Sequence, residues 1–93
     1  MTGSEIVAVR VMIRGRVQGV WYRAWTVQTA QQLGLAGWVR NQHDGSVEAL
    51  FAGSAADIEA MIARCRQGPP SAQVDAIDRA DAEPPAEAGF RQL

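Results

Sequence analysis

The strongest constraint on the fold is an alternating segment that runs directly into a glycine-containing loop. From Ile6 to Ile13 every odd position is valine or isoleucine, which is the period-two pattern of a strand buried on one face. The loop Gly15 to Val20 follows with two glycines, and no glycine or proline then occurs as far as Leu33. This order predicts a strand, a loop and a helix.

The first predicted helix lies within Trp21 to Leu33. Four of its residues share one helical face because they recur at spacings of four, four and three, and Gly34 supplies a C-terminal stop. Short strands are predicted at Ala36 to Asn41 and Val47 to Ala52, around the hairpin signal Asp44-Gly45. The residues on the helical face are Tyr22, Thr26, Ala30 and Leu33.

The second predicted helix begins after Ser54, a good cap, with Asp57 three residues later, and ends at Gly68. A fourth strand is expected at Val74 to Arg79. We expect Ala80 to Ala88 to be irregular and Phe90 to Leu93 to add a terminal edge.

The predicted order is strand, helix, strand, strand, helix, strand. It indicates an α+β, ferredoxin-like βαββαβ sandwich, with two helices packed on one face of an antiparallel sheet. We expect one domain over residues 1–93. In this topology the first two strands are parallel, so the loop Gly15 to Val20, Arg23 in the first helical turn, and Asn41 should converge at one sheet edge.

The charges are uneven, although the net charge is only -1. All positive side chains are arginine, and the residues up to His43 carry Glu5 as their only acidic residue. The residues up to His43 therefore favour an anionic ligand, whereas the net charge of the whole chain disfavours nucleic acid or an anionic membrane as a partner. The arginines of this half are Arg10, Arg14, Arg16, Arg23 and Arg40.

A phosphate group is the anion that this arrangement fits best. A helix N-terminus presents unpaired N–H groups and a partial positive charge, and a glycine-containing loop before it can turn its amides inward. Arg23 would add a planar fork of donors that matches two phosphate oxygens.

Two stretches of the sequence resemble the signatures of the acylphosphatase family. The second stretch lies within Gly37 to Gly53 and follows the first at the family's spacing. The first consists of Ile13, Gly15, Val17, Gln18, Gly19, Val20, Tyr22 and Arg23, and the second of Gly37, Trp38, Val39, Arg40, Asn41, Gly45, Val47 and Gly53.

The resemblance implies hydrolysis of acyl phosphates to a carboxylate and inorganic phosphate, without a metal or other cofactor. It assigns phosphate binding to Arg23 and the loop, and the orientation of water to Asn41. Tyr22, where phenylalanine is usual, and Gln42, where a small hydroxyl residue is often found, depart from the family pattern, as does the C-terminus. The phosphate-binding loop comprises Gly15, Arg16, Val17, Gln18, Gly19 and Val20.

Cys65 and His43 are the only residues of their types, so the chain alone offers neither an internal disulfide nor a Cys/His zinc site. No apolar stretch approaches the roughly 20 residues of a membrane span. We therefore expect a metal-free cytoplasmic monomer. Cys65 is expected in the core, and His43 in a solvated turn rather than in catalysis.

Several side chains allow a second interpretation. Trp21 and Trp25 could line the substrate's acyl group, although packing over the sheet is favoured. Glu48 is expected to face solvent. The same holds for Asp75 and Asp78.

Two other functional classes compete with this interpretation, and only the second stays open. An RNA-binding module shares the strand and helix order but needs two stacking aromatics on the central strands, which the predicted sheet lacks. A phosphate sensor, or an accessory domain acting on an intermediate of a larger enzyme, would keep the same phosphate-binding loop.

Overall fold

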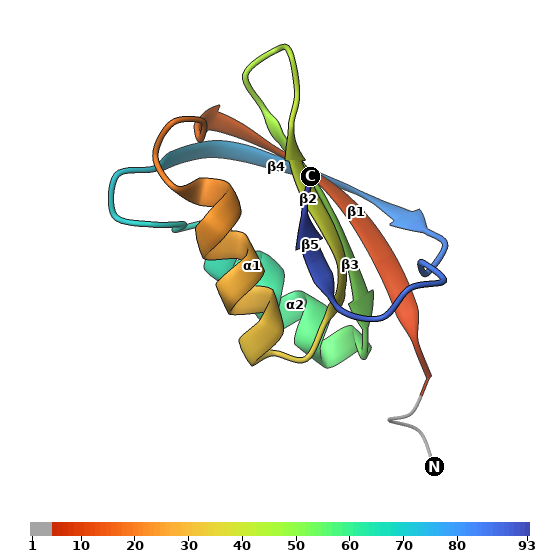
Figure 1. The fold of residues 1–93 in the computed structure, drawn as a ribbon. Helices are drawn as coiled ribbons and strands as arrows, with labels where there is room; N and C mark the ends of the chain where they lie inside the picture. The colour runs from red at the N-terminus through yellow and green to blue at the C-terminus, as the bar shows by residue number, and fades with distance from the viewer. Residues whose placement is uncertain (1–4) are drawn as a thin grey trace.

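The computed structural model describes residues 5–93 and has two helices on one face of a five-stranded sheet (Figure 1). No helix in this range is long and apolar enough to cross a membrane. Along the chain the elements are β1 (Val7–Arg16), α1 (Tyr22–Gln32), β2 (Ala36–Asn41), β3 (Val47–Gly53), α2 (Ala55–Cys65), β4 (Gln73–Ala82) and β5 (Phe90–Gln92).

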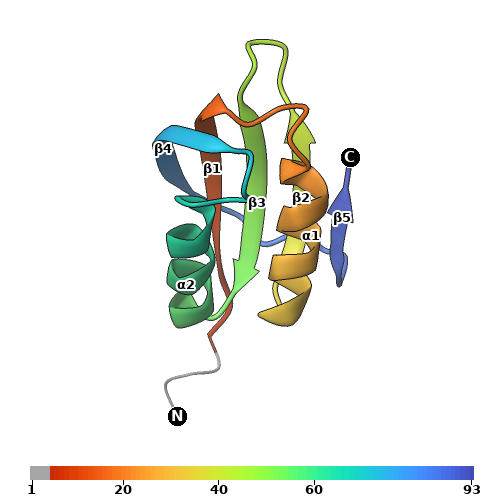
Figure 2. The same ribbon diagram turned by 90° about the vertical axis from the view of Figure 1, so that its left-hand side faces the viewer.

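The strand order is β4-β1-β3-β2-β5 (Figure 2). Strands β1 and β2 both pair antiparallel with β3, so they run parallel to each other with β3 between them. Their C-terminal ends consequently lie at the same edge of the sheet. The α+β, ferredoxin-like prediction is confirmed, with one addition: β5 pairs parallel with β2 and makes the sheet mixed.

The two helices begin in different ways. Ser54 caps α2, because its hydroxyl oxygen accepts a hydrogen bond from the Asp57 amide at 3.1 Å, as the sequence predicted. Helix α1 begins after Trp21, whose side chain forms no capping hydrogen bond, and its first turn contains no acidic residue. The N–H groups at the start of α1 are therefore left for other acceptors.

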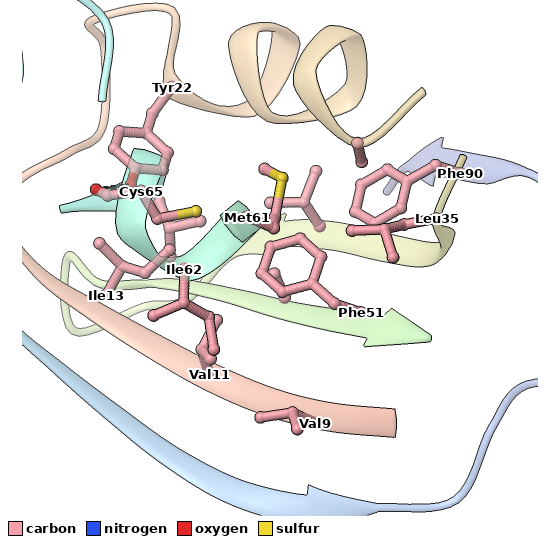
Figure 3. Close-up of a cluster of buried hydrophobic side chains, with 14 of the residues drawn as sticks. Val9, Val11, Ile13, Tyr22, Leu35, Phe51, Met61, Ile62, Cys65 and Phe90 are labelled. Carbon is pink, nitrogen blue, oxygen red and sulfur yellow. Dashed lines mark hydrogen bonds between the residues drawn. The ribbon is translucent and has the colours of Figure 1, made fainter. Parts of the chain in front are cut away.

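The core lies between the helices and the sheet (Figure 3). The rings of Phe51 and Phe90 stack at 5.7 Å between centroids, which joins β3 to the terminal strand. Tyr22 is buried at the start of α1, and its hydroxyl donates to the main-chain oxygen of Cys65 at 2.6 Å. The prediction that this hydroxyl would find water or backbone is thus confirmed.

Cys65 behaves as the small core residue that the sequence predicted. Its side chain is fully buried, and burial raises the pKa of its thiol to about 12. A thiol with so high a pKa is protonated and unreactive at neutral pH.

Glu48 corrects one expectation. It lies on the sheet face turned away from the helices, but it is only 3% exposed, because Arg10, Arg40 and Gln42 all donate hydrogen bonds to its carboxylate. Asp75 is exposed, as expected. The same is true of Asp78.

Strands β1 and β4 are longer than predicted. Strand β1 continues past Ile13 through an irregularity between Arg14 and Gly15 and pairs there with the start of β4. Gly15 has φ +130, and a Cβ built on it would lie 2.2 Å from the main-chain oxygen of Gln73. Only glycine therefore allows the two strands to approach so closely here. At its other end β4 reaches Ala82, because it pairs with β1 as far as Ala8.

Candidate active site

A cavity of about 420 Å³ opens where β1 and β2 end and α1 begins. It brings together the loop between β1 and α1, the first turn of α1, the end of β2 and the terminal strand. Its lining residues are Val17, Gly19, Trp21, Tyr22, Arg23, Ala24, Asn41 and Gln92.

The parallel arrangement of β1 and β2 explains this convergence. The chain leaves β1 at Arg16, passes along the loop and enters α1 at Tyr22, whereas β2 ends at Asn41 beside the same sheet edge. Figure 2 shows the loop between β1 and α1 crossing toward the end of β2. The predicted meeting of the loop, Arg23 and Asn41 is therefore present in the structure.

The main-chain amides around this cavity form an uninterrupted series. Within the described residues 5–93, no N–H from Val17 to Ala24 donates to a main-chain or side-chain acceptor, and the first helical bond runs from the Trp25 amide to the Trp21 oxygen at 3.0 Å. Unpaired donors at a helix N-terminus attract anions. Gly19, with φ +73, gives the loop a left-handed turn that glycine adopts without strain.

Arg23 is the second residue of α1 and is half-buried. A cation is unfavourable at this end of a helix, because the helix dipole is positive there. Its Nη1 donates to the main-chain oxygen of Leu93 at 3.2 Å, which holds the guanidinium at the cavity. The same planar group can donate two parallel hydrogen bonds to a phosphoryl group.

Asn41 closes the cavity at the end of β2 and is exposed to solvent. Its side-chain amide forms no hydrogen bond with any residue between 5 and 93. An amide can accept a hydrogen bond through its oxygen and donate two through its nitrogen, so it can orient a water molecule, but it cannot serve as a base near neutral pH.

Gln18 connects the loop to the turn that follows Asn41. Its Nε2 donates to the main-chain oxygens of Gln42 at 2.7 Å and of Ser46 at 2.9 Å. The turn is also closed within itself, because the Asp44 carboxylate accepts from both the amide and the hydroxyl of Ser46. The two hydrogen bonds of Gln18 therefore set the spacing between the amide-bearing loop and Asn41.

The structure distributes the predicted loop residues over three roles. Val17 and Gly19 line the cavity, and Val20 is buried in the core. Gly15 and Arg16 belong to the end of β1 and do not line the cavity. Gln18 acts through the hydrogen bonds described above rather than as a lining residue.

Gln92 is a lining residue that the sequence did not indicate. It reaches the cavity because β5 lies beside β2, where Val39 is its partner. The chain reaches this position only after it returns from β4 to the far side of the sheet. No local sequence pattern predicts which strand β5 then pairs with. Ala24 lines the cavity simply because it belongs to the first turn of α1.

The two helix tryptophans differ in their surroundings. Trp21 is 80% exposed and lines the cavity, so the favoured expectation of packing over the sheet is wrong for this residue. Trp25 is half-buried against the core, and its ring lies 5.4 Å from that of Tyr22. His43 is exposed in the turn between β2 and β3, as expected.

The site as a whole suits the binding of a phosphoryl anion and a water molecule. Amides and Arg23 offer donors on one side, and Asn41 offers a polar amide on another. No group of histidine, cysteine, aspartate or glutamate within residues 5–93 is arranged to hold a metal ion. Lining side chains that could supply a nucleophile are also missing, since Tyr22 is engaged with Cys65.

The family model for acylphosphatase matches residues 9–92. An acylphosphatase of Rhodospirillum rubrum is 60% identical over 82 residues, which is 88% of this chain and 90% of that protein.

Solved structures give the same match at lower identity. An acylphosphatase from Coxiella burnetii superposes with a TM-score of 0.92 at 29% identity and covers both chains completely. Full-length HypF in its phosphate- and nucleotide-bound form matches 97% of this chain with a TM-score of 0.85 at 29% identity, but the match covers only 12% of that longer protein.

Proposed function

The chain belongs to the acylphosphatase family and hydrolyses acyl phosphates to a carboxylate and inorganic phosphate, and from this premise we propose the roles of its residues. Arg23 and the amides of the loop and first helical turn bind the phosphoryl oxygens. Asn41 orients the water that attacks phosphorus. The observation that carries this assignment is the shared cavity, in which Arg23, Asn41 and Gly19 face one space.

The chemistry requires little more than positioning and charge stabilisation. An acyl phosphate has a good leaving group, a carboxylate, and its transition state spreads negative charge over the phosphoryl oxygens. Donors already fixed in place stabilise that charge without reorganisation, and an oriented water molecule attacks in line with the leaving oxygen. A phosphoryl oxygen of the substrate takes the proton of the water, because Asn41 cannot. This mechanism uses no metal.

The test is hydrolysis of benzoyl phosphate in EDTA by the wild type and by Arg23→Ala and Asn41→Ala variants. Loss of a charged hydrogen bond should weaken inhibition by phosphate about tenfold or more in Arg23→Ala and lower turnover as well. Loss of water orientation should lower kcat of Asn41→Ala about 100-fold to 1,000-fold with phosphate inhibition little changed. Arg66→Ala, which removes an exposed arginine at the end of α2, is the matched control.

Either of two results would contradict these roles. Equal loss of phosphate affinity in Arg23→Ala and Asn41→Ala would mean that Asn41 binds phosphate rather than water. Binding of phosphate by a folded wild type that turns over no acyl phosphate would favour the sensor or accessory domain. Circular dichroism on every variant separates both results from misfolding.

We also propose that the protein acts in the cytoplasm as a monomer, with no nucleic-acid or membrane partner. A buried free thiol at Cys65 is compatible with a reducing compartment, and the slight net negative charge gives no general attraction to nucleic acid or lipid. Cell fractionation tests the location. Sedimentation at micromolar concentration, with and without added RNA, tests the monomer and the missing partner.

A further inference from the structure

Trp21 has an unusual backbone conformation. Its φ of 69 and ψ of 18 are left-handed, and it is the only residue other than glycine between 5 and 93 with a positive φ. This region is unfavourable for side chains with a Cβ, and a bulky aromatic residue is a clear outlier there. Residues held in such conformations are concentrated at functional sites.

Packing does not explain why a tryptophan occupies this position. The side chain is 80% exposed, whereas Tyr22, the next residue, is 1% exposed. An exposed indole in a strained conformation contributes little to the core. It is, however, part of the cavity wall, together with Gly19 and Arg23.

The cavity is larger than a phosphoryl group requires. Its volume of about 420 Å³ falls within the range of roughly 300–1,000 Å³ that is typical of sites for whole small molecules. The acyl carbon of a bound substrate is separated from phosphorus by one bridging oxygen. The acyl group of a substrate whose phosphoryl group is held by the loop therefore lies within the same cavity.

We propose that Trp21 forms the wall of a subsite for the acyl group and favours aromatic or bulky apolar acyl groups over acetyl. This inference rests on the phosphate role assigned above to Arg23. Among the lining residues Trp21 has the largest apolar side chain, and it is not committed to the core. Its ring can stack on an aryl group.

The experiment compares benzoyl phosphate with acetyl phosphate in four variants. Trp21→Gly and Trp21→Asn remove the ring and place residues that tolerate left-handed backbone there, whereas Trp21→Phe keeps an aromatic ring. Trp38→Phe is the control, because Trp38 lies on the sheet face away from the helices, under the guanidinium of Arg40. Inhibition by phenylphosphonate and by inorganic phosphate gives a measure of binding that is independent of turnover.

The expected result is a change in selectivity. In Trp21→Gly and Trp21→Asn the ratio of kcat/KM for benzoyl to acetyl phosphate should fall about twofold to tenfold, mostly through KM. Inhibition by phenylphosphonate should weaken to a similar extent, whereas inhibition by phosphate should not change. Trp21→Phe should keep most of the selectivity, and Tm should rise in the glycine variant by several degrees, because the strain is relieved.

Three outcomes would overturn the inference: an unchanged ratio in Trp21→Gly, an equal loss for both substrates, or a fall in Tm that shows a structural role for the ring. An unchanged ratio together with self-association that the variant abolishes would assign Trp21 to a protein contact. These outcomes are distinct from failure of the proposed function. In that case Arg23→Ala and Asn41→Ala would leave acetyl phosphate turnover intact.

Discussion

The carboxylate of Glu48 accepts a hydrogen bond from Nε of Arg40 at 2.8 Å, directly across the strand pair that ends at Asn41. The same carboxylate accepts from Nη1 of Arg10 at 2.9 Å and from the side-chain amide of Gln42. Arg40 and Gln42 are the chain neighbours of Asn41. Because side chains alternate along a strand, Glu48 fixes these neighbours from the face opposite to the cavity.

Replacing this carboxylate should therefore affect both stability and turnover. In Glu48→Gln the two arginines lose their counter-charge but stay half-exposed, so we expect a loss of about 1 to 3 kcal/mol in the free energy of unfolding. A less firmly held Asn41 should lower kcat several-fold, with inhibition by phosphate unchanged. Urea unfolding followed by tryptophan fluorescence, together with steady-state kinetics, measures both effects.

Glu59→Gln is the matched control for this prediction. Glu59 accepts two hydrogen bonds from Arg79 on the surface, at 2.7 and 3.1 Å, and its side chain is 61% exposed. Exposed ion pairs contribute about 0 to 1 kcal/mol, so this variant should lose less than Glu48→Gln and keep full kcat. Equal losses of stability and of kcat in the two variants would mean that the hydrogen bonds to Glu48 contribute no more than an exposed ion pair.

The same carboxylate should contribute to loss of stability in acid. Burial alone would raise the pKa of Glu48, but the hydrogen bonds and charges of Arg40 and Arg10 outweigh it and hold the pKa below the ordinary value of 4.5. A group whose pKa is lower in the folded state stabilises that state above its unfolded pKa, and this contribution is lost as the pH falls through the folded pKa.

The wild type should thus exceed Glu48→Gln in stability at pH 7, and the difference should shrink below about pH 4.5. Asp44 and Glu59, whose pKa values are also lowered, by hydrogen bonds from Ser46 and Arg79 respectively, titrate in both proteins and cancel in the comparison. Urea midpoints measured from pH 3 to pH 7 test this. A difference that stays constant over that range would contradict the prediction.

Gln18 should matter through its two hydrogen bonds rather than through contact with substrate. Gln18→Ala removes both bonds between the loop and the turn after β2, and we expect a loss of about 1 to 3 kcal/mol in stability. The amides and Asn41 would then be less well positioned, so kcat/KM for an acyl phosphate should fall about tenfold.

Gln18→Glu and Gln28→Ala make this prediction sharper. Glutamate keeps the shape but, when ionised, turns an acceptor toward the oxygens of Gln42 and Ser46, so it should be at least as damaging as alanine. Gln28 is exposed on α1, and alanine there favours a helix. If Gln18→Ala were as active as Gln28→Ala, the spacing of loop and turn would not depend on Gln18.

Local chemistry accounts for the parts of the fold that could be predicted. Ser54 and Asp57 mark the start of α2, and alternation from Val7 to Ile13 marks the buried side of β1. The sequence prediction ended β1 too early, because a glycine usually ends a strand. In the structure Gly15 lies within β1 and lets its backbone approach β4 closely. The extension of β4 to Ala82 depends on pairing with β1, which no local pattern records.

The candidate site was predictable only where the topology brings the ends of two strands together. Arg23 and Asn41 share a cavity because two parallel strands end at one edge. Gln92 depends on a distant strand pairing. Glu48 could not be recognised as buried, because alternation assigns it to the outer face correctly but says nothing about the arginines that cover it.

Tyr22 provides the last prediction, because its hydroxyl joins the start of α1 to the end of α2 through a hydrogen bond. The hydroxyl donates to the Cys65 oxygen at 2.6 Å, and within residues 5–93 this oxygen accepts no other hydrogen bond outside the helix. Burial raises the pKa of the Tyr22 phenol, so it stays a donor at any ordinary pH. Tyr22→Phe should leave a buried carbonyl unsatisfied and cost about 1 to 3 kcal/mol.

Activity should not follow this loss of stability. The ring of Tyr22 stays beside the cavity in Tyr22→Phe, and its hydroxyl points to Cys65 rather than to the substrate, so kcat and KM at 25 °C should stay within about twofold of the wild type. Thermal unfolding and benzoyl phosphate kinetics on the same sample separate the two effects. A fall in kcat without a fall in Tm would mean that the hydroxyl acts in the reaction, whereas unchanged stability would mean that water replaces it at Cys65.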